Sequence, residues 1–366
     1  MTPDGHDARR SEATPAPLAS LWSLDDIHRE ALARLDPHVM NMIDGGAGTG
    51  ATIRANDDAF YRWHLRPRAL NGVAEPSLSV SVLGHPIAAP LMFSPSGLHG
   101  LAHPDGELAT ARAARDAGLL AVLSSNTSHP VDIVAAQGAP LWFQFYWGRD
   151  RGAVKELIEL AHAAGVRALC LTADMPTRPW LQATMRSAVA AIAHVPSAHG
   201  KPRSVHLDPA QVWEHDARLT WDDLAWLRSI TTLPIVVKGV MCGADAVLAA
   251  DHGAAAVIVS NHGGRTLDRG AATLEVLPEV VEHVAGKVEV YLDGGIRRGS
   301  DIAIAVALGA RAVLIARPVQ WGLAIGGSAG VDRVVELLLG ELRSVMTMLG
   351  ASSPAQLGAA SLRRAA

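Results

Sequence analysis

The sequence predicts a single α/β domain folded as a (β/α)8 TIM barrel, with a helical segment before it and a long loop after the fourth strand. From about residue 90, short apolar runs alternate with amphipathic segments that end in glycine. We count eight such units, the number that closes a parallel barrel. The competing fold is an open doubly wound sheet, but no GxGxxG motif follows the first predicted strand.

The segment before the barrel is predicted to contain a helix and a turn. Ser23–Asp26 is typical of a helix start, and Ile27 and Ala31 give the following helix an apolar face. Asp44–Gly48 is rich in glycine and predicts a turn. Pro76–Pro86 is predicted to form a short hairpin that closes one end of the barrel.

The barrel strands are predicted from apolar runs that are short enough to be buried parallel strands. They are Pro90–Ser96, Leu120–Ser125, Leu141–Trp147, Ala168–Asp174, Pro234–Val240, Ala255–Asn261, Val288–Gly294 and Arg311–Arg317. Helices with a closing glycine, a residue favoured at helix C-termini, are predicted between them. They are Gly106–Gly118, Arg151–Gly165, Ala244–Gly253, Leu274–Gly286 and Ser300–Gly309.

Two segments are predicted to lie outside the regular units. Residues 1–20 lack the apolar stretch of a secretion signal and are predicted to be a flexible arm, which leaves 21–366 as one domain. The stretch from 175 to 217 is rich in Pro, Ala, Ser and His and has little periodicity. A loop of this length in a compact domain is typical of a lid over an active site.

Composition excludes several classes of function. Of the 366 residues, 49% are hydrophobic and 19% charged, and the net charge is −4. No run of Lys or Arg stands out and no stretch reaches the ~18 apolar residues of a membrane span, so neither nucleic acid nor a membrane is an expected partner. The two cysteines, Cys170 and Cys242, have no metal-type neighbours, which predicts a reduced, cytoplasmic protein without a metal site.

Polar residues follow the predicted strands, at the barrel end that carries the chemistry in this fold. After the sixth strand, His262 and Arg265 are separated by two glycines, which places one base beside one guanidinium. This pair suits an enzyme that takes a proton from a small acid. Asp174 follows the fourth strand, and a carboxylate that meets His262 across the barrel mouth would fix its tautomer and raise its basicity.

Lys238 lies inside an apolar strand, where a charge is costly without a partner of opposite sign. The sequence leaves open whether that partner is a reduced flavin, a carbonyl substrate in a Schiff base, or a carboxylate such as Asp174. Asp293–Gly299 and Arg317 predict a phosphate site after the last two strands. Glycine N–H groups and the N-terminus of the next helix would bind the anion there.

The chain resembles the FMN-dependent 2-hydroxy-acid oxidases and dehydrogenases, the family of the glycolate, lactate and mandelate enzymes. The resemblance runs from about residue 21 to 350 and rests mainly on Ser260–Asp268, where Thr266 replaces the usual glutamine. Shorter matching motifs support it. They are Ala102–Glu107, Phe143–Tyr146, Leu171–Asp174, Val237–Val240 and Leu292–Gly299.

The resemblance implies that FMN binds at the barrel mouth. It implies that His262 is the base with Asp174 behind it, and that Lys238 offsets charge on the reduced ring. It assigns the substrate carboxylate to Arg265 and a hydrogen bond near the reacting carbon to Tyr146. The implied cofactor contacts are Pro95, Ser96 (through its main chain), Gly97, Ser124, Gln144, Thr172, Lys238, Ser260, His262, Gly263, Asp293, Gly294, Gly295, Arg297, Ala316 and Arg317.

Three positions depart from the family pattern. Met42 stands where a tyrosine usually helps to hold the carboxylate, and Leu181 stands where a second arginine is often found. Arg178 is a candidate to replace that arginine from a shifted position. Ala316 replaces the glycine that usually precedes the phosphate arginine. Together with Gly97, the first two changes predict a roomier, more apolar pocket that suits an aromatic, mandelate-like acid.

The sequence leaves several alternatives open. A related subgroup oxidises modified amines derived from peptides, and the run Val319–Ala324 resembles it, although Arg265 is retained here. A flavin-binding protein with reduced catalysis is a further alternative. The resemblance implies a homotetramer, but the electron acceptor, whether oxygen or another carrier, stays open. So does the choice between hydride transfer and a carbanion.

Overall fold

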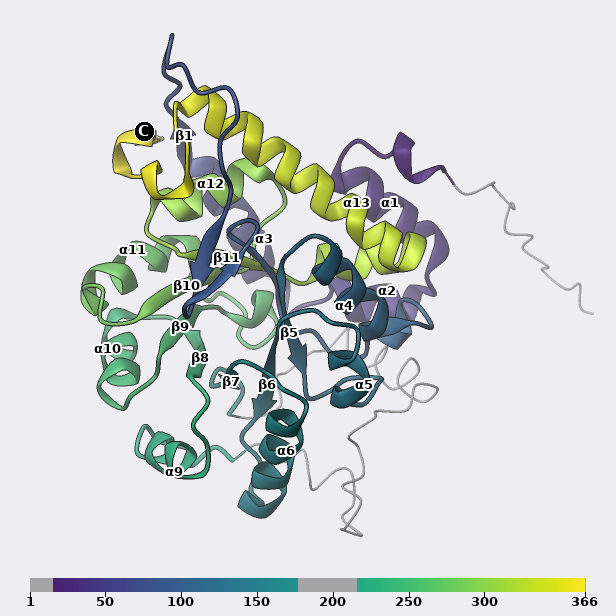
Figure 1. The fold of residues 1–366 in the computed structure, drawn as a ribbon, viewed down its shortest axis with the longest axis vertical. Helices are drawn as coiled ribbons and strands as arrows, with labels where there is room; N and C mark the ends of the chain where they lie inside the picture. Colours follow the sequence, from purple (N-terminus) through teal and green to yellow (C-terminus); the bar gives the residue numbers. More distant parts are fainter. Residues whose placement is uncertain (1–15, 177–215, 366) are drawn as a thin grey trace, which may run out of the picture.

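The computed structural model describes residues 16–176 and 216–365. Its centre is a closed barrel of eight strands, in which each strand pairs in parallel with its neighbour along the chain and the last pairs with the first (Figure 1). The barrel strands are β4 (Leu91–Phe93), β5 (Leu120–Ser124), β6 (Leu141–Tyr146), β7 (Leu169–Thr172), β8 (Ile235–Val240), β9 (Ala256–Val259), β10 (Glu289–Asp293) and β11 (Ala312–Ile315). Each lies within one predicted run, so the predicted TIM barrel is confirmed.

Helices surround the barrel (Figure 1). They are α4 (Gly106–Asp116), α5 (Val131–Ala135), α6 (Arg151–Ala163), α9 (Asp223–Ile230), α10 (Gly243–Asp251), α11 (Thr273–Val284) and α12 (Gly299–Ala307). The five predicted helices correspond to α4, α6, α10, α11 and α12. Their closing glycines adopt the left-handed conformation expected of a helix C-terminus, with φ of 78° at Gly165 and 87° at Gly253.

The segment before the barrel folds into α1 (Leu24–Arg34), α2 (Pro37–Asp44) and α3 (Ala51–Asp58). Ser23 caps α1 as predicted, because its hydroxyl accepts a hydrogen bond from the Asp26 N–H. The chain closes with the long helix α13 (Arg317–Leu349), which packs along α1, α4 and α12 (Figure 1). Short strands β1 (Trp63–Leu65) and β12 (Leu362–Arg364) pair beside it.

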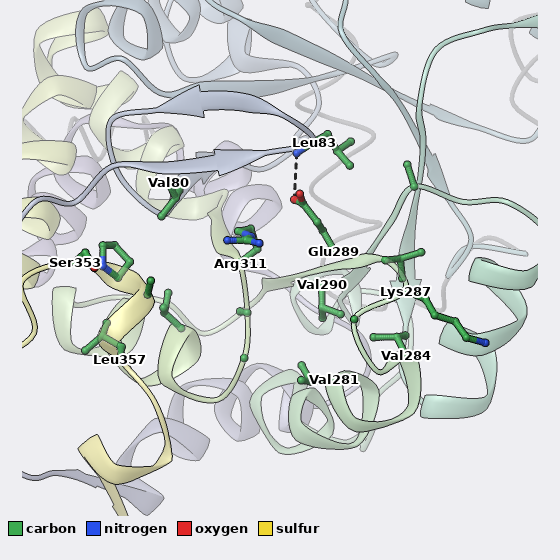
Figure 2. Close-up of a pocket in the computed structure, with 18 of the residues that line it drawn as sticks. Val80, Leu83, Val281, Val284, Lys287, Glu289, Val290, Arg311, Ser353 and Leu357 are labelled. Atoms are coloured by element: carbon green, nitrogen blue, oxygen red, sulfur yellow. Dashed lines mark hydrogen bonds between the residues drawn. The ribbon is translucent and has the colours of Figure 1, made fainter.

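The amino-terminal end of the barrel is closed by a hairpin, as predicted. Its strands are β2 (Val80–Val82) and β3 (His85–Ile87), and Val82 and Ile87 pack on the residues that fill the barrel interior, such as Trp142. Beside the hairpin lies a groove of about 540 Å³ with several valines on its walls (Figure 2). Glu289, which also lines this groove, accepts a hydrogen bond from the Leu83 N–H at 3.1 Å (Figure 2). The polar strand ends lie at the opposite, carboxyl end.

Two predicted segments fall largely outside the described residues. The predicted lid over 175–217 is described only at its two ends, and Arg178 and Leu181 lie in the part that is not described. The end of the predicted arm forms a 3-10 turn, η1 (Leu18–Ser20), that packs on α13. Within the described parts, no helix is long and apolar enough to cross a membrane.

Candidate active site

His262 and Asp174 meet at the carboxyl end of the barrel. His262 Nδ1 lies 3.0 Å from Asp174 Oδ1, which joins the turn after β9 to the exit of β7. Burial works to raise the pKa of Asp174, but the imidazole beside it, their hydrogen bond and the charge of Lys238 lower that pKa below its ordinary value. The carboxylate is therefore ionised and accepts the Nδ1 proton, which leaves Nε2 as the basic nitrogen.

The turn that carries His262 is strained and firmly held. His262, Gly263 and Gly264 have φ of 57°, 63° and 76°, a left-handed conformation that non-glycine residues rarely adopt. The Asn261 amide accepts the Gly264 N–H at 3.0 Å and pairs with Asn56 of α3 through two hydrogen bonds of 2.8 and 2.9 Å. Sequence reasoning missed Asn56. Its only signal was a polar residue on the buried side of a short helix.

Replacing Asn56 by alanine is expected to lower the free energy of unfolding by about 2–4 kcal/mol. The change removes the two hydrogen bonds between Asn56 and the buried Asn261 amide, worth about 0.5–1.5 kcal/mol each, and leaves the buried Thr273 N–H without its side-chain acceptor, at a cost of about 1–3 kcal/mol. Urea unfolding measures the loss. Asn71→Ala, at an exposed amide, is the matched control and should change stability by less than about 1 kcal/mol. Equal effects of the two changes would contradict this role for Asn56.

Tyr146 and Arg265 lie beside the histidine. The Tyr146 ring lies 6.4 Å from the His262 ring between centroids. Burial, with a contribution from the Asp174 charge, raises the pKa of Tyr146 to about 12, so its hydroxyl stays protonated and can donate. The Arg265 guanidinium donates to the main-chain oxygens of Met42 and Gly45, each at 2.8 Å. Met42 therefore contacts Arg265 through its backbone, at the carboxyl end of α2.

Lys238 forms a buried ion pair, but with a different carboxylate from the one suggested by the sequence. Its Nζ lies 2.9 Å from Asp293 Oδ2 and donates to the Ser260 hydroxyl at 2.8 Å. Of the three alternatives, a carboxylate partner is present, but it is Asp293 and not Asp174. Side chains from alternate strands form one layer inside a barrel, and β8 and β10 bring Lys238 and Asp293 into the same layer. The charges of Asp293 and Asp174 raise the Lys238 pKa although burial opposes them.

Three buried polar side chains from β5, β6 and β7 form a second row, which we call the Ser124–Thr172 row and which consists of Ser124, Gln144 and Thr172. The Ser124 hydroxyl donates to the Gln144 side-chain oxygen at 2.9 Å, and the Gln144 amide donates to the Thr172 hydroxyl at 2.8 Å. These three side chains are nearly inaccessible to solvent. The row therefore lines one side of the barrel mouth, and Lys238 with its partners Ser260 and Asp293 lines the other.

The predicted phosphate corner gathers positive charge. Burial and the neighbouring charges of Arg265 and Arg297 lower the pKa of Arg317 to about 9. The Arg317 guanidinium donates to the main-chain oxygens of Ile43 and Gly45 at 3.2 and 3.1 Å, and no carboxylate pairs with it among the described residues. Arg297 Nη2 lies 3.4 Å from Asp57 Oδ1. An anion at this corner would relieve the repulsion among Arg265, Arg297 and Arg317.

Three N–H groups at the start of the next helix, which the sequence offered to an anion, already have carboxylate partners. Asp301 accepts the N–H groups of Arg297 and Arg298 at 2.9 Å, and Glu341 accepts the Gly299 N–H at 2.8 Å. The start of α12 is thus already capped by the protein. Packing also requires glycine at position 295, because a Cβ there would come within 2.3 Å of the main-chain oxygen of Asn56.

The remaining predicted residues lie around the same mouth. Pro95, Ser96 and Gly97 follow β4, and a Cβ on Gly97 would lie 3.0 Å from Asn126 Cβ. Gly294 follows β10, and its φ of 113° requires glycine. Ala316 is the residue that precedes α13.

The mouth fits FMN in its chemistry. A flavin needs hydrogen-bonding groups along a planar ring, and its phosphate needs cations. The ring contacts are available from the Ser124–Thr172 row and from Lys238, and the cations are Arg317 and Arg297. Among the residues that the structure describes, Asp174 Oδ2 also has no hydrogen-bond partner although it is buried. A buried polar atom of this kind is expected where a ligand binds.

The chain is similar in sequence to enzymes that oxidise hydroxy acids. Residues 31–364 match the family model described as FMN-dependent dehydrogenase. The chain is 42% identical over 359 residues to an L-lactate oxidase of Nostoc sp. (strain PCC 7120), covering 92% of this chain and 96% of that relative. It is 38% identical over 347 residues to the 2-hydroxyacid oxidase 1 of Homo sapiens, with coverage of 91% and 94%.

Solved structures show the same similarity. A mandelate oxidase with benzoyl-formic acid superposes with a TM-score of 0.86 at 37% identity, covering 93% of this chain and 98% of that one. A soluble mutant of the membrane-associated (S)-mandelate dehydrogenase from Pseudomonas putida gives a TM-score of 0.89 at 32% identity, with coverage of 94% and 99%. The chain therefore belongs to the FMN-dependent 2-hydroxy-acid oxidases and dehydrogenases, and FMN is its cofactor.

Proposed function

We propose that this enzyme oxidises a bulky or aromatic 2-hydroxy acid to the 2-keto acid. The observation that carries the proposal is the hydrogen-bonded pair of His262 and Asp174 on the same rim as Arg265. A base with a fixed tautomer and a partly buried guanidinium are the two groups that this oxidation requires from the protein. Family membership supports the reaction type, and the residue roles below are part of the proposal.

Each residue at the rim has a defined task in the proposed reaction. Arg265 binds the substrate carboxylate in a two-pronged contact, and Tyr146 donates a hydrogen bond beside the reacting carbon. His262 accepts a proton from the substrate at Nε2, and Asp174 stabilises the imidazolium that results. FMN, when bound, accepts the two electrons that leave the substrate.

Other residues hold the cofactor in this proposal. Lys238, paired with Asp293, places positive charge beside the ring. The Ser124–Thr172 row, with Pro95, Ser96 and Gly97, borders the ring. Arg297 and Arg317 bind the phosphate.

The proposed substrate class rests on residues at the mouth. Met42 offers no hydroxyl to a carboxylate, and its main-chain oxygen already contacts Arg265. Gly97 has no side chain beside the expected ring position. Both features favour a large apolar substituent on the acid over the hydrogen or methyl group of glycolate or lactate. The relatives include lactate and mandelate enzymes, so comparison alone does not choose between them.

Met42→Tyr is expected to shift the specificity toward small acids. The new hydroxyl would share the carboxylate with Arg265, and the ring would occupy space that an aromatic substrate needs. The ratio of kcat/KM for mandelate to that for lactate should fall by about tenfold or more. Rates of anaerobic flavin bleaching with glycolate, lactate and mandelate measure this ratio. A wild-type enzyme that prefers glycolate or lactate would overturn the proposed substrate class.

The proposed assembly is a homotetramer in the cytoplasm that passes electrons to oxygen or another carrier. Light scattering on the purified holoenzyme tests the first statement, and a monomeric mass would contradict it. Oxygen uptake during turnover tests the acceptor. Reoxidation of the reduced enzyme by a quinone or dye but not by oxygen would identify a dehydrogenase.

A further inference from the structure

A buried histidine that the proposed reaction does not use lies directly behind the barrel mouth. His99 belongs to the short turn η3 (His99–Leu101) after β4, and only 5% of it is exposed. Its Nε2 shares a hydrogen bond of 2.7 Å with the Ser96 hydroxyl. Its Nδ1 shares one of 2.8 Å with the Thr110 hydroxyl on α4. Both ring nitrogens are therefore engaged, and one of them points toward a residue at the mouth.

The backbone around His99 is built to hold this orientation. Leu98 has a φ of 56°, a left-handed conformation that is costly for leucine. The buried Glu107 carboxylate accepts the His99 N–H and the Ser128 N–H, each at 3.0 Å. Strained residues of this kind persist where the surrounding structure over-determines them, and they cluster at functional sites.

The His99 group borders the polar row of the active site. A small cavity of about 20 Å³ is lined by Ser96, His99 and Ser124, and Ser124 begins the row that continues to Thr172. Ser96 itself is only half-buried, so a ligand in the mouth can reach it. Burial lowers the pKa of His99, although the Glu107 charge opposes it, so the imidazole is neutral. A neutral ring carries one N–H and one acceptor nitrogen, which gives the Ser96 hydroxyl a fixed partner.

We infer that His99 is a positioning residue for the flavin ring, which acts by fixing the Ser96 hydroxyl and main chain where β4 opens into the mouth. The inference rests on the proposed placement of the ring beside Ser96. Because the His99–Ser96 contact is the element that matters, loss of the Thr110 contact alone should be tolerated better. A purely structural role for His99 would depend on both contacts alike.

Two conservative substitutions separate the contacts. The side-chain amide of glutamine reaches about as far as histidine Nε2 and carries both a donor and an acceptor, so His99→Gln keeps a hydrogen-bond partner for Ser96. The shorter asparagine places its amide near the position of Nδ1, so His99→Asn keeps a hydrogen-bond partner for Thr110 only. Ser96→Ala removes the hydroxyl itself. His129→Gln is the matched control, because His129 contacts the same Glu107 carboxylate without touching Ser96.

Titration of each full-length apoprotein with FMN, followed by flavin fluorescence, gives the first readout. His99→Asn and Ser96→Ala should each bind FMN about five- to tenfold more weakly, the loss expected for one hydrogen bond. His99→Gln and His129→Gln should stay within about twofold of the wild type. The double variant Ser96→Ala/His99→Asn should bind no more weakly than Ser96→Ala alone, because both changes remove one shared contact.

The flavin midpoint potential, measured anaerobically against a reference dye, gives the second readout. It reports the ratio of affinities for oxidised and reduced FMN, and a tenfold change in that ratio corresponds to about 30 mV for two electrons. His99→Asn should shift the potential, and His99→Gln should not. Equal values for these two variants, or wild-type values for both, would overturn the inference. If His99→Asn fails to fold, Ser96→Ala against His99→Gln carries the comparison. Neither readout uses a substrate, so the proposed reaction can fail independently.

Discussion

Replacing His262 by alanine is expected to leave FMN bound and to slow flavin reduction by substrate about 10²–10⁴-fold, the range for loss of a general base. The imidazole presents Nε2 as its basic nitrogen at the rim, because Nδ1 is bonded to Asp174 at 3.0 Å. Anaerobic stopped-flow bleaching of the flavin at saturating substrate measures the step directly. Reduction at the wild-type rate would remove His262 from the role of base.

Asp174→Asn is the informative companion to that experiment. The amide keeps the size of the side chain but removes the charge that fixes the tautomer and stabilises the imidazolium. Flavin reduction should slow, though less than in His262→Ala, because the basic ring remains. The pKa of Asp174 lies below its ordinary value, so its contribution is complete above about pH 4 and is lost only as the pH falls through that lowered pKa.

Replacing Arg265 by methionine is expected to lower kcat/KM by about 10²–10³-fold. The substrate carboxylate would lose its charge-assisted contacts, and truncating one partner of a buried charge pair costs about 2–5 kcal/mol. Arg265→Lys keeps the charge without the planar pair of donors, so it should recover only part of the loss. Steady-state kinetics with the preferred 2-hydroxy acid measure both variants.

The control for Arg265 concerns folding, because its guanidinium also binds the main-chain oxygens of Met42 and Gly45. Arg54→Met is the matched change, since Arg54 donates to the Thr49 main-chain oxygen at 3.0 Å on an exposed part of α3. It should leave kcat/KM unchanged. Unchanged kinetics in Arg265→Met, with FMN bound and the protein folded, would contradict the carboxylate role.

The barrel could be predicted because each of its strands is buried on both faces. Such strands are continuous apolar runs, as in Leu169–Thr172 and Ala256–Val259. They can be identified in the sequence without knowing which strands pair with them. The closing glycines marked the helix ends for a similar local reason. The helix α13 was missed because Gly326 and Gly327 interrupt it, with φ of −174° and 57°, and its continuation depends on packing against α1 and α4.

The membership of the site could be predicted better than its contacts. His262, Arg265 and Asp174 follow strand ends, so their place at the mouth follows from topology. The partner of Lys238 does not follow from the topology, because it depends on which strands contribute side chains to the same layer of the barrel interior. The pair formed by Asn56 and Asn261 joins residues 205 positions apart, and no local pattern marks it. The caps on α12 come from Asp301 and from the distant Glu341, which only the folded chain brings there.

The central claim is that FMN binds at the mouth where an imidazole and a guanidinium present a 2-hydroxy acid to it. The most direct measurement is an anaerobic titration of the FMN-loaded enzyme with (S)-mandelate, followed by flavin absorbance. We expect one equivalent of FMN per chain, bleaching of the flavin by the acid, and formation of one equivalent of the 2-keto acid. Protein that takes up no FMN, or bound FMN that stays oxidised with every 2-hydroxy acid tried, would contradict it.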